Sequence, residues 1–97
     1  MTRVDILQTA IDIYGISAQE DMLLEEMAEL QKAVLKLRRV DSVTGALSDL
    51  EDVREEIADV QIMLDQMRLI YGDTTEQEAF KLERLEKRME GETNDPN

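Results

Sequence analysis

The chain has 97 residues, of which 23 are acidic and 11 basic, and its formal net charge is −12. It contains neither Cys nor His, which excludes disulfides, thiolate or HExxH zinc sites, cysteine nucleophiles and Ser-His-Asp catalysis. The acids are spread along the chain, so binding to nucleic acid through its phosphates is disfavoured, whereas binding of hard cations is favoured.

Hydrophobic residues make up 42% of the chain and charged residues 35%, with one Pro and four Gly. This profile is typical of a soluble all-α protein. No apolar run approaches the roughly 20 residues that span a bilayer, and the first ten residues lack the apolar stretch of a signal peptide. We therefore expect a single cytoplasmic domain over residues 1–90 with no membrane partner. Its small size favours assembly with a second subunit.

Four hydroxyl residues each precede an acidic residue by three positions, which is the capping-box pattern of a helix start: Thr2, Ser17, Ser48 and Thr75. Gly15 and Gly72 suit helix C-termini, and residues 41–46 (DSVTGA) predict a polar loop. The last residues, 91–97 (GETNDPN), predict a disordered tail. The predicted helices span about residues 3–14, 18–40, 48–71 and 76–90.

Apolar residues recur every three or four positions in each predicted helix. The stripe of the second helix is Leu23, Met27, Leu30, Val34 and Leu37. That of the third is Leu50, Val53, Ile57, Val60, Leu64 and Met67, and the last helix carries Leu82, Leu85 and Met89. These stripes predict a four-helix, bundle-like core in which the two long helices form an antiparallel central pair and shorter helices flank it. Further apolar residues off the stripes suggest that each long helix buries two faces, one of them in a dimer.

Two acidic pairs have a spacing of three residues, which places each pair on one helix face: Glu26 with Glu29, and Glu56 with Asp59. In an antiparallel hairpin, residues at equal height have positions with a constant sum. The residue numbers of Glu26 and Asp59 add to the same sum as those of Glu29 and Glu56. The midpoint that this sum implies for the hairpin falls inside the predicted loop. The four carboxylates are therefore predicted to meet at the rim of the seam between the helices.

Such a cluster repels itself, so it takes up protons or binds a cation. All-oxygen ligation suits Mg²⁺, with Mn²⁺ as a possible substitute. The alternative interpretation is a solvated acidic helix face, which is common in a chain this acidic. Four other acids fit that interpretation: Glu51, Asp52, Glu55 and Asp65.

The segments EEMAE at 25–29 and EIAD at 56–59 resemble the EExxE…ExxD signature of the MazG-like all-α nucleoside triphosphate pyrophosphatases, and the likeness covers about residues 17–71. It implies Mg²⁺-dependent hydrolysis of the α–β phosphate bond, giving a nucleoside monophosphate and pyrophosphate. It also implies a homo-oligomer, either a dimer or a tetramer. The metal ligands implied are Glu26, Glu29, Glu56 and Asp59.

The same resemblance implies that Glu25 is a supporting acid that orients or deprotonates a water; its alternative role is a surface partner for Glu29 or Lys32. Lys32 and Lys36 continue this helix face and are candidates for binding the phosphate tail. Surface ion pairing is their alternative role, as it is for the four cations of the last helix, Lys81, Arg84, Lys87 and Arg88. Two other functions stay open: a noncatalytic acidic module for dimerisation or interaction, and a metal-binding relic of the enzyme.

Overall fold

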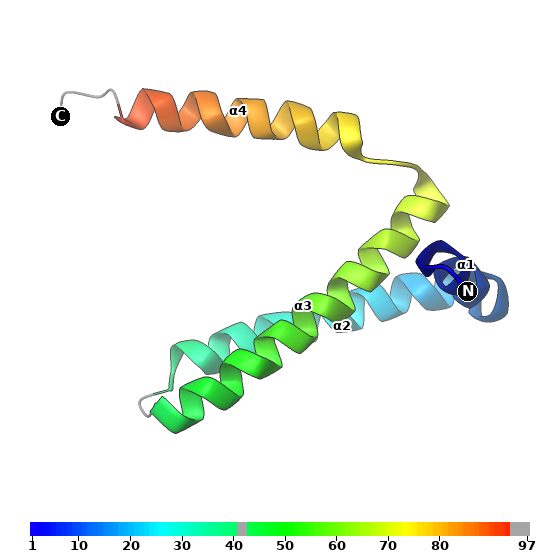
Figure 1. Cartoon of the computed structure of the whole chain (residues 1–97), viewed down its shortest axis with the longest axis horizontal. Helices are drawn as coiled ribbons and strands as arrows, with labels where there is room; N and C mark the ends of the chain where they lie inside the picture. Colours follow the sequence, from blue (N-terminus) through cyan, green and yellow to red (C-terminus); the bar gives the residue numbers. More distant parts are fainter. Residues whose placement is uncertain (41–42, 94–97) are drawn as a thin grey trace.

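The computed structural model describes residues 1–40 and 43–93, and every regular element in these ranges is a helix (Figure 1). The helices are α1 (Arg3–Tyr14), α2 (Ile16–Arg38), α3 (Val43–Tyr71) and α4 (Thr75–Thr93). The long helices α2 and α3 form an antiparallel pair, and α1 packs across one end of it. The predicted all-α fold with a long central pair is confirmed. Within the described ranges, none of the helices has a stretch with the length and hydropathy of a membrane span.

The first helix begins as predicted, with a reciprocal capping box. Thr2 Oγ1 accepts a hydrogen bond from the Asp5 backbone N–H at 3.1 Å, and the Asp5 carboxylate accepts one from the Thr2 N–H at 3.0 Å. Hydrogen bonding to the Asp5 carboxylate, first from the Thr2 backbone and then from the Thr2 side chain, lowers the pKa of Asp5. The start predicted at Ser17 is wrong. Gly15, with φ of 89°, ends α1 and turns the chain directly into α2, so no side-chain cap is used.

The third helix begins earlier than predicted, at Val43, so the loop predicted over 41–46 is wrong from Val43 onward. Residues 41 and 42 lie outside the described ranges. A Gly inside a helix costs only about 1 kcal/mol relative to Ala, and tertiary packing offsets a cost of that size. In this first part of α3, Asp49 is buried and pairs with Lys36 of α2 at 3.6 Å.

The last helix packs along no other helix of the described chain (Figure 1). Its first turn is tied down: Arg68 Nε donates to Thr74 Oγ1 at 2.9 Å, and that hydroxyl donates to the Glu78 carboxylate at 2.6 Å. Gly72, with φ of 115°, turns the chain away from the α2/α3 pair. The stripe of Leu82, Leu85 and Met89, predicted to lie in the core, is therefore exposed. The helix continues through residues 91–93, which were predicted to belong to the tail, and 94–97 lie outside the described ranges.

The seam between α2 and α3 differs from the predicted stripes at the positions that matter most for the site. Among its buried and half-buried residues are Leu23, Glu26, Leu30, Ala33 and Leu37 on α2, and Val53, Glu56, Val60 and Met63 on α3. Their spacing of three and four residues is that of a coiled-coil seam. Met27, Val34 and Ile57, which were predicted to lie in this core, are exposed. Two glutamates thus occupy core positions of the seam.

The α1 end of the pair holds the best-packed apolar residues and a polar anchor. Leu7 and Ile11 of α1 are buried there, as is Met63 of α3. Asp65 accepts hydrogen bonds from Arg3 of α1 at 2.6 Å, Arg68 at 2.9 Å and Gln61 at 3.1 Å. Asp65 is therefore a structural anchor, and its sequence-based interpretation as surface decoration is wrong.

Candidate metal centre

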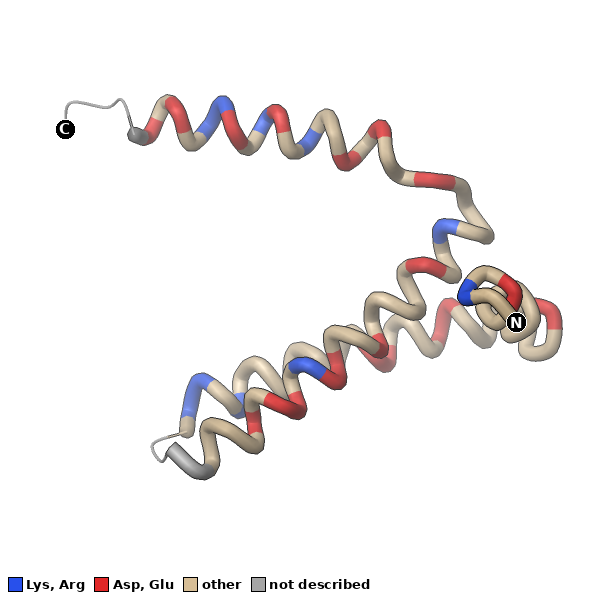
Figure 2. The backbone as a smooth tube through the Cα atoms, viewed as in Figure 1, with Lys and Arg blue, Asp and Glu red and all other residues tan. Residues whose placement is uncertain are grey.

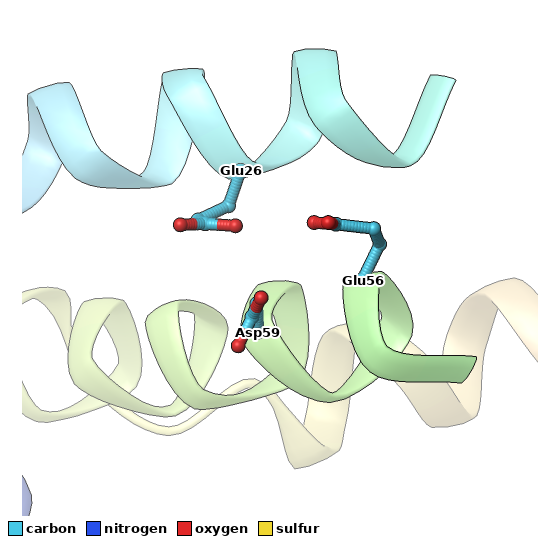
Figure 3. A group of neighbouring side chains, drawn as sticks. All are labelled: Glu26, Glu56 and Asp59. Carbon is cyan, nitrogen blue, oxygen red and sulfur yellow. The ribbon is translucent and has the colours of Figure 1, made fainter. Parts of the chain in front are cut away.

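Three of the four predicted ligands converge across the seam (Figure 3). Glu26 projects from α2 toward α3, and Glu56 and Asp59 project from α3 to meet it. One carboxylate oxygen from each residue lies within 4.8 Å of the others. The spacing of three residues puts Glu56 and Asp59 on one face of α3, and the antiparallel register brings Glu26 opposite them.

The charge of this cluster is uncompensated. Within the described residues, none of its three carboxylates forms an ion pair with Lys or Arg. Burial raises the pKa of Glu26, and the negative charges of Asp59 and Glu56 raise it further. Hydrogen bonds from a protonated Glu26 to these two neighbours act in the same direction. The cluster therefore favours either a bound proton or a bound cation.

One oxygen of Glu56 is the strongest indication of a ligand. Its Oε2 atom is shielded from solvent and has no hydrogen-bond partner among the described residues. Leaving a buried acceptor unsatisfied costs about 1–3 kcal/mol, and more when it is charged. Three carboxylate oxygens from two rigid helices form a donor set that suits a hard cation such as Mg²⁺, which completes its shell with water and phosphate oxygens. The residues present therefore fit the metal that the sequence predicts.

The other two predicted acids lie apart from the cluster. The Glu29 side chain is 54% exposed, and its Oε1 atom lies 3.9 Å from Nζ of Lys32. Glu29 nevertheless lines the same groove as Glu56. Glu25 is exposed and lines neither the cluster nor the groove within the described residues.

This groove, of about 420 Å³, runs along the seam beside the cluster. Three cations line it: Lys32 and Lys36 of α2, and Arg39 at the C-terminal cap of that helix. Lys36 pairs with Asp49, whereas Arg39 forms no ion pair with any described residue. Sequence reasoning missed Arg39, although its spacing of three from Lys36, after four between the lysines, places all three on one face.

The cations of α4 do not approach this site within one chain. Lys87 pairs with Glu83 at 3.1 Å, and the Arg84 guanidinium lies 6.0 Å from the centre of the Phe80 ring. The aromatic residues Tyr14, Tyr71 and Phe80 are all exposed.

The site thus combines a carboxylate cluster with a neighbouring groove whose lining carries both cations and acids. The first can bind a metal ion, and the second can bind phosphate oxygens. Comparison with known proteins found no matching family model, curated protein or solved structure.

Proposed function

We propose that this protein is a Mg²⁺-dependent nucleoside triphosphate pyrophosphohydrolase, which cleaves the α–β phosphate bond and releases a nucleoside monophosphate and pyrophosphate. The observation that carries the proposal is the meeting of Glu26, Glu56 and Asp59 in the seam, with a buried, unpartnered oxygen on Glu56. Apolar residues at these positions would stabilise the helix pair better. A bound cation explains why carboxylates stand there.

The reaction is inferred from the likeness of EEMAE and EIAD to the MazG-like signature. In that scheme Glu26, Glu56 and Asp59 hold the metal, and Glu29 joins them from the wall of the groove. When bound, Mg²⁺ supplies charge neutralisation at the phosphates and a lowered pKa for a coordinated water. In the same scheme Glu25, whose side chain lies apart from the cluster and the groove in this structure, would orient the attacking water or accept its proton as the water oxygen bonds to the α-phosphorus and pyrophosphate leaves.

The three cations that line the groove give the proposal its second support. Phosphoryl transfer depends on neutralising the charge that collects on the leaving group, here pyrophosphate. Lys32, Lys36 and Arg39 line the groove beside the cluster and would bind the β- and γ-phosphate oxygens. Arg39 is the best suited of the three cations. It forms no ion pair with a described carboxylate, so binding the substrate would break no such pair.

The test is pyrophosphate release from a panel of common and modified nucleoside triphosphates with Mg²⁺. Glu56→Gln and Asp59→Asn should each lower turnover by at least about a hundredfold, since each removes a charged ligand. Glu51→Gln is the matched control, because Glu51 is an exposed acid on the same helix and should keep wild-type turnover. No turnover on any nucleotide, together with no Mg²⁺ or Mn²⁺ binding by calorimetry, would refute the proposal.

A structural cation site is the second candidate, because the buried Glu56 oxygen calls for a cation whether or not chemistry follows. Calorimetry separates the two functions. Mg²⁺ binding that depends on Glu56, without turnover of any nucleotide, would leave a structural site or a relic of the enzyme. A noncatalytic interaction module, the remaining alternative, would not require carboxylates that converge.

A further inference from the structure

A second hollow lies at the α1 end of the α2/α3 pair and shares no lining residue with the groove. Its volume is about 530 Å³, and its walls come from α1, α2 and α3: Tyr14, Ala18, Gln19, Asp21, Met22 and Met63. Among the described residues that line it, none is Lys or Arg. The hollow therefore has a different chemistry from the groove, which three cations line.

The hollow, the carboxylate cluster and the groove follow one another along one side of the helix pair. Met22 of the hollow, and Glu29 and Lys36 of the groove, are seven residues apart, which is two turns and returns to nearly the same face of α2. The contact of Lys36 with Asp49 at 3.6 Å fixes the antiparallel register, in which Met63 lies level with Met22. The hollow thus begins about one turn from the cluster, on the side away from the groove.

Two buried glutamines mark this end of the seam. Gln19 lines the hollow and is 6% exposed, and Gln66 lies level with it on α3 and is 3% exposed. The Oε1 atom of Gln66 is shielded from solvent and has no hydrogen-bond partner among the described residues. This level of the seam therefore lacks a hydrogen-bond donor. A nucleobase carries N–H donors, whereas an ionised phosphate carries none.

The other walls of the hollow suit a planar ring. Tyr14 has an exposed aromatic side chain, and Met22 and Met63 have thioethers, which pack favourably against aromatic rings. The carboxylate of Asp21 would repel a phosphate. The basic residues of α2 lie toward its C-terminal end, away from α1 (Figure 2). The hollow therefore favours an uncharged ring, and the groove favours phosphates.

We propose that the hollow binds the base of the nucleotide, so that the substrate lies along the seam with its base toward α1 and its β- and γ-phosphates toward the far end of α2. This inference rests on the proposed function and gives the substrate a direction. Tyr14 stacks on the base, and Gln19 accepts a hydrogen bond from a base N–H while its own amide donates to Gln66. Gln19 and Glu26 are seven residues apart, or about 10 Å along the helix, a separation that the base and ribose span.

The first experiment measures binding of the two halves of the substrate by calorimetry, with Mg²⁺ present. Gln19→Leu should weaken binding of the nucleoside monophosphates at least about tenfold and leave pyrophosphate binding unchanged. Gln31→Leu is the matched control, because Gln31 is an exposed glutamine of the same helix, and it should change neither. Equal losses of both ligands in Gln19→Leu, or unchanged monophosphate binding, would overturn the proposal.

Tyr14→Ala repeats this test at an exposed side chain, where loss of folding is not expected. It should also weaken monophosphate binding alone, whereas Phe80→Ala, which removes an exposed ring of α4, should have no effect. Monophosphate binding that depends on Gln19 and Tyr14, without pyrophosphate release from any nucleotide, would refute the hydrolase and retain the base site. Turnover that neither substitution affects would retain the hydrolase and refute the base site.

The second experiment locates the base directly. The probes are 8-azidoadenosine triphosphate and 4-thiouridine triphosphate, which carry their photoreactive groups on the base. After irradiation with Mg²⁺, mass spectrometry of the digested protein should find the label within residues 14–22 or on Met63. A label within residues 32–39 would reverse the direction of the substrate. That result, or the absence of any label that unmodified nucleotide competes away, would overturn the proposal.

Discussion

Asp65 and Glu26 are carboxylates of the same helix pair with opposite surroundings. Arg3 holds the Asp65 carboxylate most strongly, with Gln61 and Arg68 assisting, and the pKa of Asp65 is lowered. Glu26 meets burial and two further carboxylates, and its pKa is raised. The acid near α1 is satisfied by the chain itself, whereas the acid in the seam is not.

This contrast separates structural from functional acids better than burial or charge density does. A carboxylate that serves the fold has its own arginines and gains from being ionised. The seam cluster has no cation among the described residues, so its ionised form opposes folding until a ligand binds. A set of substitutions can measure how far the two regions differ.

The largest expected effect comes from the apolar contact that supports the α1 end. Leu7 is 6% exposed, so Leu7→Ala should lower the free energy of unfolding by about 2–4 kcal/mol. The neighbouring Ile6→Ala is the control, because Ile6 is exposed; it should change stability by less than about 1 kcal/mol. Urea unfolding followed by circular dichroism measures both. Equal losses would mean that α1 is not held by its buried face.

Removing the anchored charge should have the next largest effect. Asp65→Asn should cost about 1–2 kcal/mol at pH 7, discounted because Asp65 and its arginines are partly exposed. The pKa of Asp65 is lowered from 3.8 in the folded state, so its stabilisation is complete above that value and is lost as the pH falls through the lowered pKa. The difference between wild type and Asp65→Asn should therefore close below about pH 3.8. Asp21→Asn, which changes an exposed acid, should show no such pH dependence; a difference for Asp65→Asn that persists at low pH would contradict the anchor.

Substitution of a seam acid should change the stability in the opposite direction, by raising it. Glu56→Gln should stabilise the metal-free protein, by about 1 kcal/mol, because it removes repulsion. The raised pKa of Glu26 means that wild-type stability without metal falls as the pH rises from 4.5 through the raised value, and Glu56→Gln should weaken this fall. Added Mg²⁺ should raise the melting temperature of the wild type more than that of the variant. Identical melts of both proteins with and without Mg²⁺ would show that the acids do not interact.

Glu29 should give the smallest change in the metal-free protein. Its side chain is largely exposed and its contact with Lys32 is long, so Glu29→Gln should alter stability by less than about 0.5 kcal/mol. A weaker Mg²⁺-dependent rise in melting temperature would nevertheless identify Glu29 as a ligand. An unchanged Mg²⁺ titration would restrict the ligand set to Glu26, Glu56 and Asp59.

The sequence predicts the helices well because their apolar periodicity is strong, but it does not resolve which residues form the seam. On α2 and α3 the apolar residues cover an arc wider than one helix face, so Met27 and Ile57 compete with Glu26 and Glu56 for the core positions. The general preference for apolar residues in a helix-pair core favours Met27 and Ile57, which is the wrong choice. The observed seam instead places Glu26 and Glu56 in the core positions and leaves Met27 and Ile57 exposed.

The site was predictable to the extent that it depends on helix geometry. The spacing of Glu56 and Asp59 and the level of Glu26 follow from the antiparallel register. The direction of the Glu29 side chain does not, because an exposed glutamate with a nearby lysine has several conformations of similar energy. Arg39 was missed because a cation at the end of a helix is common for reasons unrelated to ligands.

The backbone angles of Gly15 decide whether an L- or a D-amino acid can replace it. Its φ of 89° and ψ of 156° lie in a region that L-amino acids rarely adopt, although a Cβ built there would meet no atom within 4 Å. The obstacle to a side chain is therefore chirality rather than space. A D-alanine introduced at this position by chemical synthesis would meet less strain at these angles than any L-residue and would restrict the unfolded chain. The sharp junction of α1 and α2 could thus be stiffened by one mirror-image residue that no ribosomal substitution can imitate.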